Sequence, residues 1–423
     1  MAKQLHKRLS VEQVKAVLAQ FTTHQMSEAE SVRYLELGRA RFYELVYEYR
    51  KNPDNFSLSY KRARPTRHID TRIEENIFKE LKTEKEKIID NPDVPVQRYN
   101  YSYIKNLLQE KYQQTVSVPT IIDRAKSRGY WKTKPPKKVH DREVLTNYIG
   151  ELIQHDSSHH LFAPDAKRKW YLITSLDDHS RAILYADFVL AENTWAHISA
   201  IQSLILKYGV PLSYYVDQHQ IFRYVKDRDK QTIWTRYTKF TDDVNPQWKM
   251  VLLDCGSKAI YALSPNAKGK IERPYQWLQD HVVRTCVREG VTDIARGRQI
   301  LQAEVRAYNW QRVHSTTGEI PMIRFNRANK EKRTMFRPFV IPEPFVSAKD
   351  IFCLRTLRTT DAYRSVSLGG FNLKVPKVMP RQEVEIRLFP DLKTGITEVR
   401  FWHDDKLAGT QQVKNSDLSI VHL

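Results

Sequence analysis

The chain has 423 residues, with 69 Lys and Arg against 49 Asp and Glu, which gives a formal net charge of +20. This surplus favours a polyanionic partner, nucleic acid before an anionic membrane surface. The longest apolar runs fall short of a membrane span of roughly 20 residues, and the N-terminus lacks an apolar signal core, so we expect neither a membrane protein nor an exported one. The three cysteines are far apart and form no CxxC pair, so we expect neither a disulfide framework nor a zinc finger.

Residues 10–52 predict three short helices. Ser10 is a candidate N-cap, and Ser27 and Glu30 have the spacing of a capping box. After the turn at residues 37–38, the last helix begins with Arg39 and Arg41. This outline predicts a helix-turn-helix DNA-binding domain over residues 1–53, in which these two arginines contact DNA. A trihelical protein-binding domain is the alternative.

A second helical unit is predicted over residues 69–131, after a polar, basic linker. Its third helix begins with Ser117 as the cap and Pro119 in the first turn. We interpret it as a second helix-turn-helix domain, winged-helix-like, rather than a unit with only a solvated face. The candidate DNA contacts on this helix are Arg124, Lys126 and Arg128. Residues 132–145, which begin with "KTKPPKK", are interpreted as a basic linker because of their prolines and charges.

Residues 146–290 change in character. The segments "LTNYIGELIQHD", "KWYLITSLDD" and "RAILYADFVL" predict three strands. A helix ending at Gly209, the strands "PLSYYVD" and "KAIYALS", and a last helix come after them. This order predicts an RNase H-like α/β catalytic core. We expect a helical extension and basic linker over residues 291–335, and a small C-terminal β-barrel over residues 336–423.

Three carboxylates are positioned for phosphodiester chemistry. Asp156 is expected to end the first strand, Asp217 the fourth, and Glu272 lies early in the last helix. The first and fourth strands are neighbours in this fold, so these groups should converge. Divalent ions that activate one oxygen and stabilise another need hard oxygen ligands on rigid elements. We therefore predict Asp156, Asp217 and Glu272 as catalytic metal ligands.

Basic residues surround the predicted site. Lys268 falls one turn before Glu272 and could hold a phosphate, although a surface ion pair between the two is the alternative. Lys270 and Arg273 would meet flanking DNA, and His219 should project to the same side as Asp217. These four residues complete the predicted DNA contacts.

Other polar residues offer rival sites. Asp177 and Asp178 form a pair after the second strand, which we interpret as a structural turn rather than a metal site. His155, His159 and His160 crowd around Asp156 and raise the possibility of zinc. Because this segment should be a turn after a strand, we expect these histidines to contact phosphate or to support a ligand instead.

The segments "HDSSHHLF", "LITSLDDHSR", "YVDQHQIFR" and "SPNAKGKIER" resemble the catalytic core of DDE transposases of the retroviral integrase superfamily. "DQHQIFR" followed by "SPNAKGKIER" is most similar to ISNCY-type bacterial insertion-sequence transposases. In that family the two Asp and the Glu bind metal, which here match Asp156, Asp217 and Glu272. More residues than in the simplest members separate Asp217 from Glu272, which predicts an inserted hairpin or flap near residues 223–247, with an irregular surface loop as the alternative.

The resemblance implies Mg²⁺ as cofactor, with Mn²⁺ able to substitute. It implies double-stranded DNA partners, both the terminal repeats of a mobile element and its target. End cleavage, joining of 3′-hydroxyl ends to the target, a dimer or larger assembly on DNA, and a cytoplasmic, nucleoid-associated location are further expectations. A catalytically silent DNA-binding regulator and an RNase H-like nuclease without strand transfer are the alternatives.

Overall fold

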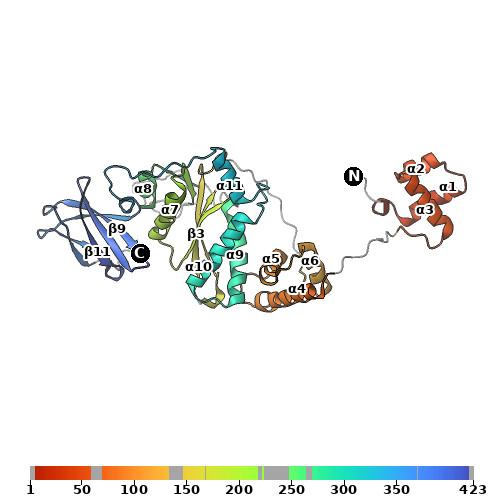
Figure 1. Ribbon diagram of the computed structural model, residues 1–423, viewed down its shortest axis with the longest axis horizontal. Helices are drawn as coiled ribbons and strands as arrows, with labels where there is room; N and C mark the ends of the chain where they lie inside the picture. The colour runs from red at the N-terminus through yellow and green to blue at the C-terminus, as the bar shows by residue number, and fades with distance from the viewer. Residues whose placement is uncertain are drawn as a thin grey trace, which may run out of the picture. The chain divides into compact units, whose positions relative to one another are not determined.

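The computed structural model describes residues 5–58, 69–132, 146–166, 168–217, 222, 247–262, 269–368 and 370–418, without the side chains of residues 269–273. The chain divides into two compact units, residues 1–71 and residues 72–423 (Figure 1). Each unit is described by itself. Within the described residues, none of the helices combines the length and the apolar character that crossing a membrane would require.

The first unit is a three-helix domain of α1 (Val11–Thr22), α2 (Glu28–Leu35) and α3 (Arg39–Lys51). Ser10 caps α1, and Ser27 with Glu30 forms the predicted capping box of α2. The apolar faces of the three helices meet in a small core around Leu18 and Phe42, which are fully buried. The helices thus match the sequence-based expectation, and their DNA-binding function remains a prediction.

A second helical unit opens the larger body of the chain. It comprises α4 (Thr71–Glu84), a π-helical turn (Lys85–Ile89), α5 (Tyr101–Tyr112) and α6 (Val118–Ser127). Asn100 caps α5 and Ser117 caps α6, with Pro119 in the first turn of α6 as predicted. Its apolar residues share one core with the central sheet and its helices, so this unit packs directly on them.

The central sheet has the strand order β3-β2-β1-β4-β5. Its strands are β1 (Ile153–His160), β2 (Trp170–Asp177), β3 (Ile183–Val189), β4 (Ser213–Val216) and β5 (Lys258–Tyr261). Strands β1, β2 and β3 pair antiparallel, whereas β4 runs parallel to both β1 and β5. The sheet is therefore mixed, and its strands and helices follow one another in the α/β order that the sequence predicted.

Strand β1 begins and ends later than the sequence indicated. Asp156 was expected at the end of this strand and His160 in a turn, but pairing with β2 continues from Ile153 to His160. The polar run after Asp156 has little strand propensity of its own. Its backbone is nevertheless held by the apolar strand β2, so tertiary pairing overrides local preference.

Helices cover both faces of the sheet (Figure 1). One face packs on α7 (Thr194–Tyr208) and α8 (Gln247–Asp254), and the other on α9 (Gly269–Glu289) and α10 (Ile294–Trp310). Gly297 of α10 allows this contact to be close, because a Cβ there would lie 2.3 Å from the ring of Trp170. Asp156 and Asp217 lie on the face of the sheet that α9 covers.

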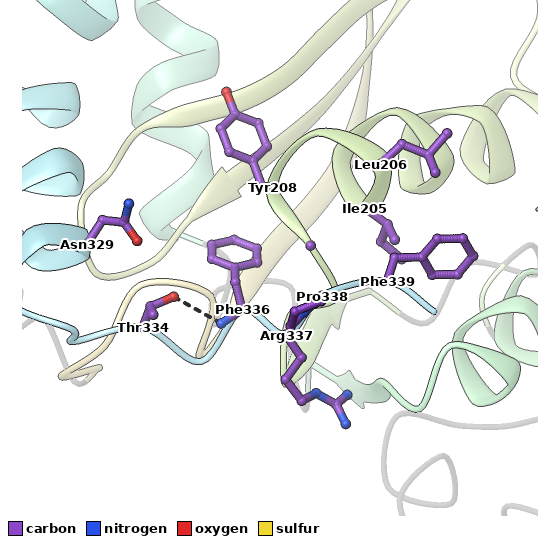
Figure 2. Close-up of a pocket in the computed structure, with 10 residues that line it drawn as sticks. Ile205, Leu206, Tyr208, Asn329, Thr334, Phe336, Arg337, Pro338 and Phe339 are labelled. Carbon is purple, nitrogen blue, oxygen red and sulfur yellow. Dashed lines mark hydrogen bonds between the residues drawn. The ribbon is translucent and has the colours of Figure 1, made fainter. Parts of the chain in front are cut away.

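The segment after α11 (Pro321–Lys330) is not a free linker. It crosses the end of α7, where Val210 and Arg337 exchange backbone hydrogen bonds of 2.8 and 3.0 Å. Figure 2 shows the ring of Phe336 below Tyr208, beside the turn that ends α7. Gly209 has φ +100°, and a Cβ there would lie 2.5 Å from the carbonyl oxygen of Arg337, so glycine permits this crossing. The predicted basic linker is thus partly helix α11 and partly packed against the core.

The C-terminal region forms two open sheets. Its elements are α12 (Ala348–Ile351), β6 (Leu354–Thr359), β7 (Ser365–Leu368), β8 (Phe371–Lys374), β9 (Glu383–Asp391), β10 (Ile396–His403) and β11 (Lys406–Lys414). Strands pair in the order β11-β10-β9-β6, and β7 pairs with β8 separately. The described strands therefore form open sheets, where the sequence had predicted a closed barrel. Arg355 of β6 contacts Asp254 of α8 at 2.5 Å, which ties this region to the core.

Candidate active site

The pairing of β1 with β4 brings two acids together. Ile153 pairs with Tyr214 and Gln154 with Tyr215, in parallel register. The same register continued along both strands brings Asp156 level with Asp217, which directly follows β4. Adjacent strands lie about 4.8 Å apart, and level residues on parallel strands face the same side. The two carboxylates are therefore near neighbours on the face covered by α9, and both are partly exposed.

Helix α9 reaches this face through Tyr275. Its buried phenol accepts a hydrogen bond of 2.8 Å from the hydroxyl of Thr174, which is the cross-strand partner of Asp156. Burial raises the pKa of Tyr275 well above its usual range, and the negative charges of Asp156, Glu192 and Asp217 raise it further. Tyr275 is therefore a neutral hydroxyl at neutral pH, hydrogen-bonded to Thr174 on the face of the sheet that carries Asp156.

Glu272 lies in the first turn of α9, three positions before Tyr275. Residues three apart on a helix are one turn apart on the same side. Its side chain lies outside the described atoms, as do those of Lys270 and Arg273. Lys268, His219 and the predicted flap up to residue 246 lie outside the described residues altogether. Their assignment to the site stays a prediction.

The opposite face of β1 carries a buried hydrogen-bond chain. The Nδ1 of His155 lies 2.9 Å from the Ser175 hydroxyl, and its Nε2 lies 2.8 Å from Nδ1 of His197 in α7. The Nε2 of His197 lies 3.1 Å from a carboxylate oxygen of Glu192, which also accepts from the Ser157 hydroxyl at 2.5 Å. His155 and Ser157 flank Asp156. The chain, termed the β1 clamp, therefore holds the strand on both sides of this acid.

Asp177 and Asp178 form a structural turn, as interpreted from the sequence. The Asp177 carboxylate accepts hydrogen bonds from the amides of Gly150 and Ser180, each at 2.8 Å, and from the Ser180 hydroxyl. Asp178 accepts from Arg181 at 2.8 Å and from Thr146 at 3.0 Å. Burial raises the pKa of Asp177 to about 6 despite these donors. Both acids are fully buried and engaged by protein groups, so they are not positioned for metal ligation.

The three histidines near Asp156 do not converge. His155 is buried in the β1 clamp, His159 stacks on Tyr171 with ring centroids 4.2 Å apart, and His160 lies against Phe162. Within the part of the chain that the structure describes, no group of three or more His, Cys, Asp or Glu could hold a metal ion. Asp156 and Asp217 are carboxylates of the kind that Mg²⁺ prefers as ligands, and a metal bound between them would need a third ligand from elsewhere.

The predicted DNA contacts on the two helical units are engaged within the chain. Arg39 contacts Glu28 at 2.6 Å, Arg41 contacts Glu44 at 2.7 Å, and Arg124 contacts Glu74 at 2.7 Å. Lys126 lies over the ring of Trp131, and the guanidinium of Arg128 lies 3.5 Å from the ring centre of Phe78. Such surface pairs contribute about 0–1 kcal/mol each. A phosphate could therefore replace these partners at little cost.

Sequence reasoning did not identify Tyr275 and Glu192. The sequence pattern of α9 indicates that Tyr275 is a buried apolar position, and it does not indicate a role in a polar site. Glu192 stands in a loop before α7, 36 residues after Asp156. Glu192 contacts Ser157 of β1 only because β3 and α7 fold against β1, and no local sequence motif indicates this packing.

Comparison with known proteins finds bacterial transposases. No family model matches the chain. It is 25% identical over 198 residues to the putative transposase y4bF of Sinorhizobium fredii, covering 47% of this chain and 41% of that protein. It is 28% identical over 177 residues to the transposase for insertion sequence IS1202 of Streptococcus pneumoniae, covering 42% and 36%. The matches thus span about two fifths of these relatives, and they confirm the predicted resemblance to transposases.

Two of the solved structures with some likeness come from retroviral integrases. The HTLV-2 integrase catalytic core domain in complex with magnesium is 18% identical, covering 43% of this chain and 98% of that one, with a TM-score of 0.29. The simian T-cell lymphotropic virus intasome in complex with PP2A regulatory subunit B56 gamma is 13% identical, covering 71% and 89%, with a TM-score of 0.31. At these TM-scores the likeness carries no argument about the site.

Proposed function

We propose that this chain is a DNA transposase of the DDE type, which cleaves the ends of a mobile element and joins the 3′-hydroxyl ends to target DNA. The observation that supports the proposal is the parallel β1–β4 register, whose extension by two residues aligns Asp156 with Asp217 on the face that α9 covers. Tyr275 supports it, because it links α9 to this face one turn from Glu272. Similarity to bacterial transposases supports the same reaction class.

In this proposal Asp156, Asp217 and Glu272 hold divalent metal, Mg²⁺ or Mn²⁺. The metal, when bound, activates the attacking oxygen and stabilises the leaving oxygen of the phosphodiester. The chain supplies the frame for this chemistry: the sheet aligns two carboxylates, and the Tyr275–Thr174 hydrogen bond fixes α9 against them. Lys268, Lys270, Arg273 and His219 would hold the phosphates of the DNA at the site.

The proposal is tested with DNA carrying the sequences that flank the gene. The full chain should nick this DNA at the repeat end and produce joined target products in Mg²⁺, and neither product should form in EDTA. Binding without cutting in Mg²⁺ and Mn²⁺ would favour a regulator. Cutting without joining would favour a nuclease.

The first helical unit is proposed to recognise the terminal repeats. Because it forms a compact unit of its own, a chain that lacks residues 1–58 should keep the fold of the remainder. We expect its affinity for repeat DNA to fall at least about tenfold, toward that for unrelated DNA. Competition binding with labelled repeat and unrelated duplexes measures this. Equal loss of affinity for both duplexes would mean that the unit binds DNA without recognising the repeats.

The β1 clamp yields a second prediction. In Glu192→Gln the carboxylate that binds Ser157 and His197 becomes an amide of the same shape, so β1 should lose its fixed position around Asp156. We expect Mn²⁺ affinity, measured by calorimetry, to fall about 10- to 100-fold.

The matched control for this change is Glu304→Gln. Glu304 also lies 3.1 Å from a histidine nitrogen, that of His281, but this pair lies between α9 and α10 and not on β1. Metal affinity should be unchanged in the control. Equal metal affinity in both variants would show that the β1 clamp does not affect metal binding.

The finer features of assembly derive from the reaction. Cutting two ends together needs two catalytic chains, so we propose a dimer or larger complex on DNA. The open C-terminal sheets, predicted as a barrel, would bind DNA without sequence preference or contact another subunit. Action on DNA agrees with the proposed nucleoid-associated, cytoplasmic location.

A further inference from the structure

A polar cleft lies between α5 and the helices α9 and α10. Its volume is about 670 Å³. Gln276 and Trp277 of α9 line it, one turn along the helix from Glu272. One turn of helix corresponds to about 5.4 Å. The cleft is therefore lined by the turn of α9 that follows Glu272, and it belongs to the same compact unit as the central sheet.

Three cations line this cleft: Arg98, Lys105 and Arg312. Among the described residues, none of these three side chains makes a hydrogen bond or an ion pair. Most other arginines near α9 are paired with acids, as Arg288 is with Glu80 at 2.6 Å. Three unpaired cations in one concave site indicate an anionic ligand.

Among the described residues that line the cleft, the one acid, Asp280, is already paired with a cation. Asp280 accepts hydrogen bonds of 3.0 and 2.9 Å from the buried guanidinium of Arg284, and another from Asn100. Its negative charge therefore does not oppose an anion. Asn100 also caps α5, so the positive end of that helix faces the same region.

The remaining lining groups suit a nucleic acid strand. The amides of Asn106, Gln276 and Gln311 can donate to and accept from base edges. Arg312 is held in place by aromatic rings, with its guanidinium carbon 5.3 Å from the centre of Trp277 and 5.8 Å from that of Tyr308. A volume of this size encloses a drug-sized ligand. It therefore accommodates about one or two nucleotides of a single strand, and not a duplex.

We infer that this cleft binds one strand of the DNA next to the cleavage point, with its phosphates on Arg98, Lys105 and Arg312. This rests on the proposed function for the identity of the anion. The single strand would be unpaired DNA at the element end, and the nearby α9 would connect its binding to the catalytic carboxylates.

The test compares a blunt duplex with the same duplex carrying a short single-stranded extension, using the full chain and fluorescence anisotropy without metal. The wild type should bind the extended DNA roughly tenfold more tightly, the effect of a few charge-assisted hydrogen bonds. Arg312→Met should reduce this preference to near one and lower the salt slope by about one phosphate. Methionine keeps the apolar contact with Trp277, and Lys105→Gln provides a second variant on the other side of the cleft, on α5.

Arg306→Met is the matched control, because Arg306 lies exposed on α10 outside the cleft. It makes the same change in charge and should keep the preference for extended DNA. A wild type without preference, or variants that keep it as the control does, would overturn the inference. Since no metal or cutting is involved, the result is distinguishable from a failure of transposition: the preference can exist in a protein that does not cleave.

Discussion

Asp217→Asn should abolish DNA cleavage and strand transfer while leaving the protein folded and able to bind DNA. The substitution preserves the shape of the side chain but removes the negative charge that lies level with Asp156. A neutral amide is a poor ligand for Mg²⁺ compared with a carboxylate. We expect the rate of cleavage to fall on the order of 10³-fold, as for loss of a group that stabilises transition-state charge. The measurement is the single-turnover rate of nicking at the repeat end in Mg²⁺.

Asp165→Asn provides the matched control for this prediction. Asp165 is an exposed acid in the short helix between β1 and β2, outside the segments of β1 and β4 that pair with each other. This variant should cut and join DNA at the wild-type rate. If Asp217→Asn also retained activity, the assignment of the metal ligands would be wrong. If both variants lost activity, a general loss of stability would be the cause.

Arg284→Met should destabilise the larger unit by about 3–5 kcal/mol. Arg284 is completely buried in α9, where it contacts Glu84 of α4 and binds Asp280 at 2.9 Å. Arg288 extends the network to Glu84 at 2.6 Å. Removal of one guanidinium leaves buried carboxylates short of positive charge, which costs far more than the loss of a surface pair. The free energy of unfolding from urea titration, followed by tryptophan fluorescence, measures the effect.

Arg296→Met is the corresponding control at the surface. Arg296 contacts Glu289 at 2.7 Å, but about half of the Arg296 side chain and 40% of the Glu289 side chain are exposed. The change should cost no more than about 1 kcal/mol. Equal effects of the two substitutions would show that the buried network does not hold the second helical unit to α9. If Glu84 and Arg284 are coupled, the double variant Glu84→Gln with Arg284→Met should lose less free energy of unfolding than the two single variants lose in total.

Features that depend on near neighbours could be predicted from the sequence. The capping residues Ser10, Ser27 and Ser117 lie where the pattern of the following residues indicated. The β-branched and aromatic residues predicted β2 and β3, and the order of strands and helices predicted the neighbouring positions of β1 and β4. Such signals are local, because hydrogen bonds within a turn and side-chain alternation act over a few residues.

Other features were missed because they depend on residues far apart in the chain. The length of β1 depends on its pairing with β2, and the open C-terminal sheets depend on which strands meet β6 and β11. The β1 clamp joins His155 to a residue 42 positions later. The network at Arg284 joins α9 to a helix about 200 positions earlier. No periodic pattern in the sequence records such contacts.

The sequence by itself determined the chemical groups: the acids Asp156, Asp217 and Glu272, the basic surplus, and the order of helices and strands. It also carried the resemblance to transposases. Only the tertiary structure decided the register that brings Asp156 level with Asp217, the position of Tyr275 beside them, and the cations that meet in one cleft. The physical reason is that residue types and their spacing set local conformation, whereas the approach of distant groups is set by packing of the whole unit.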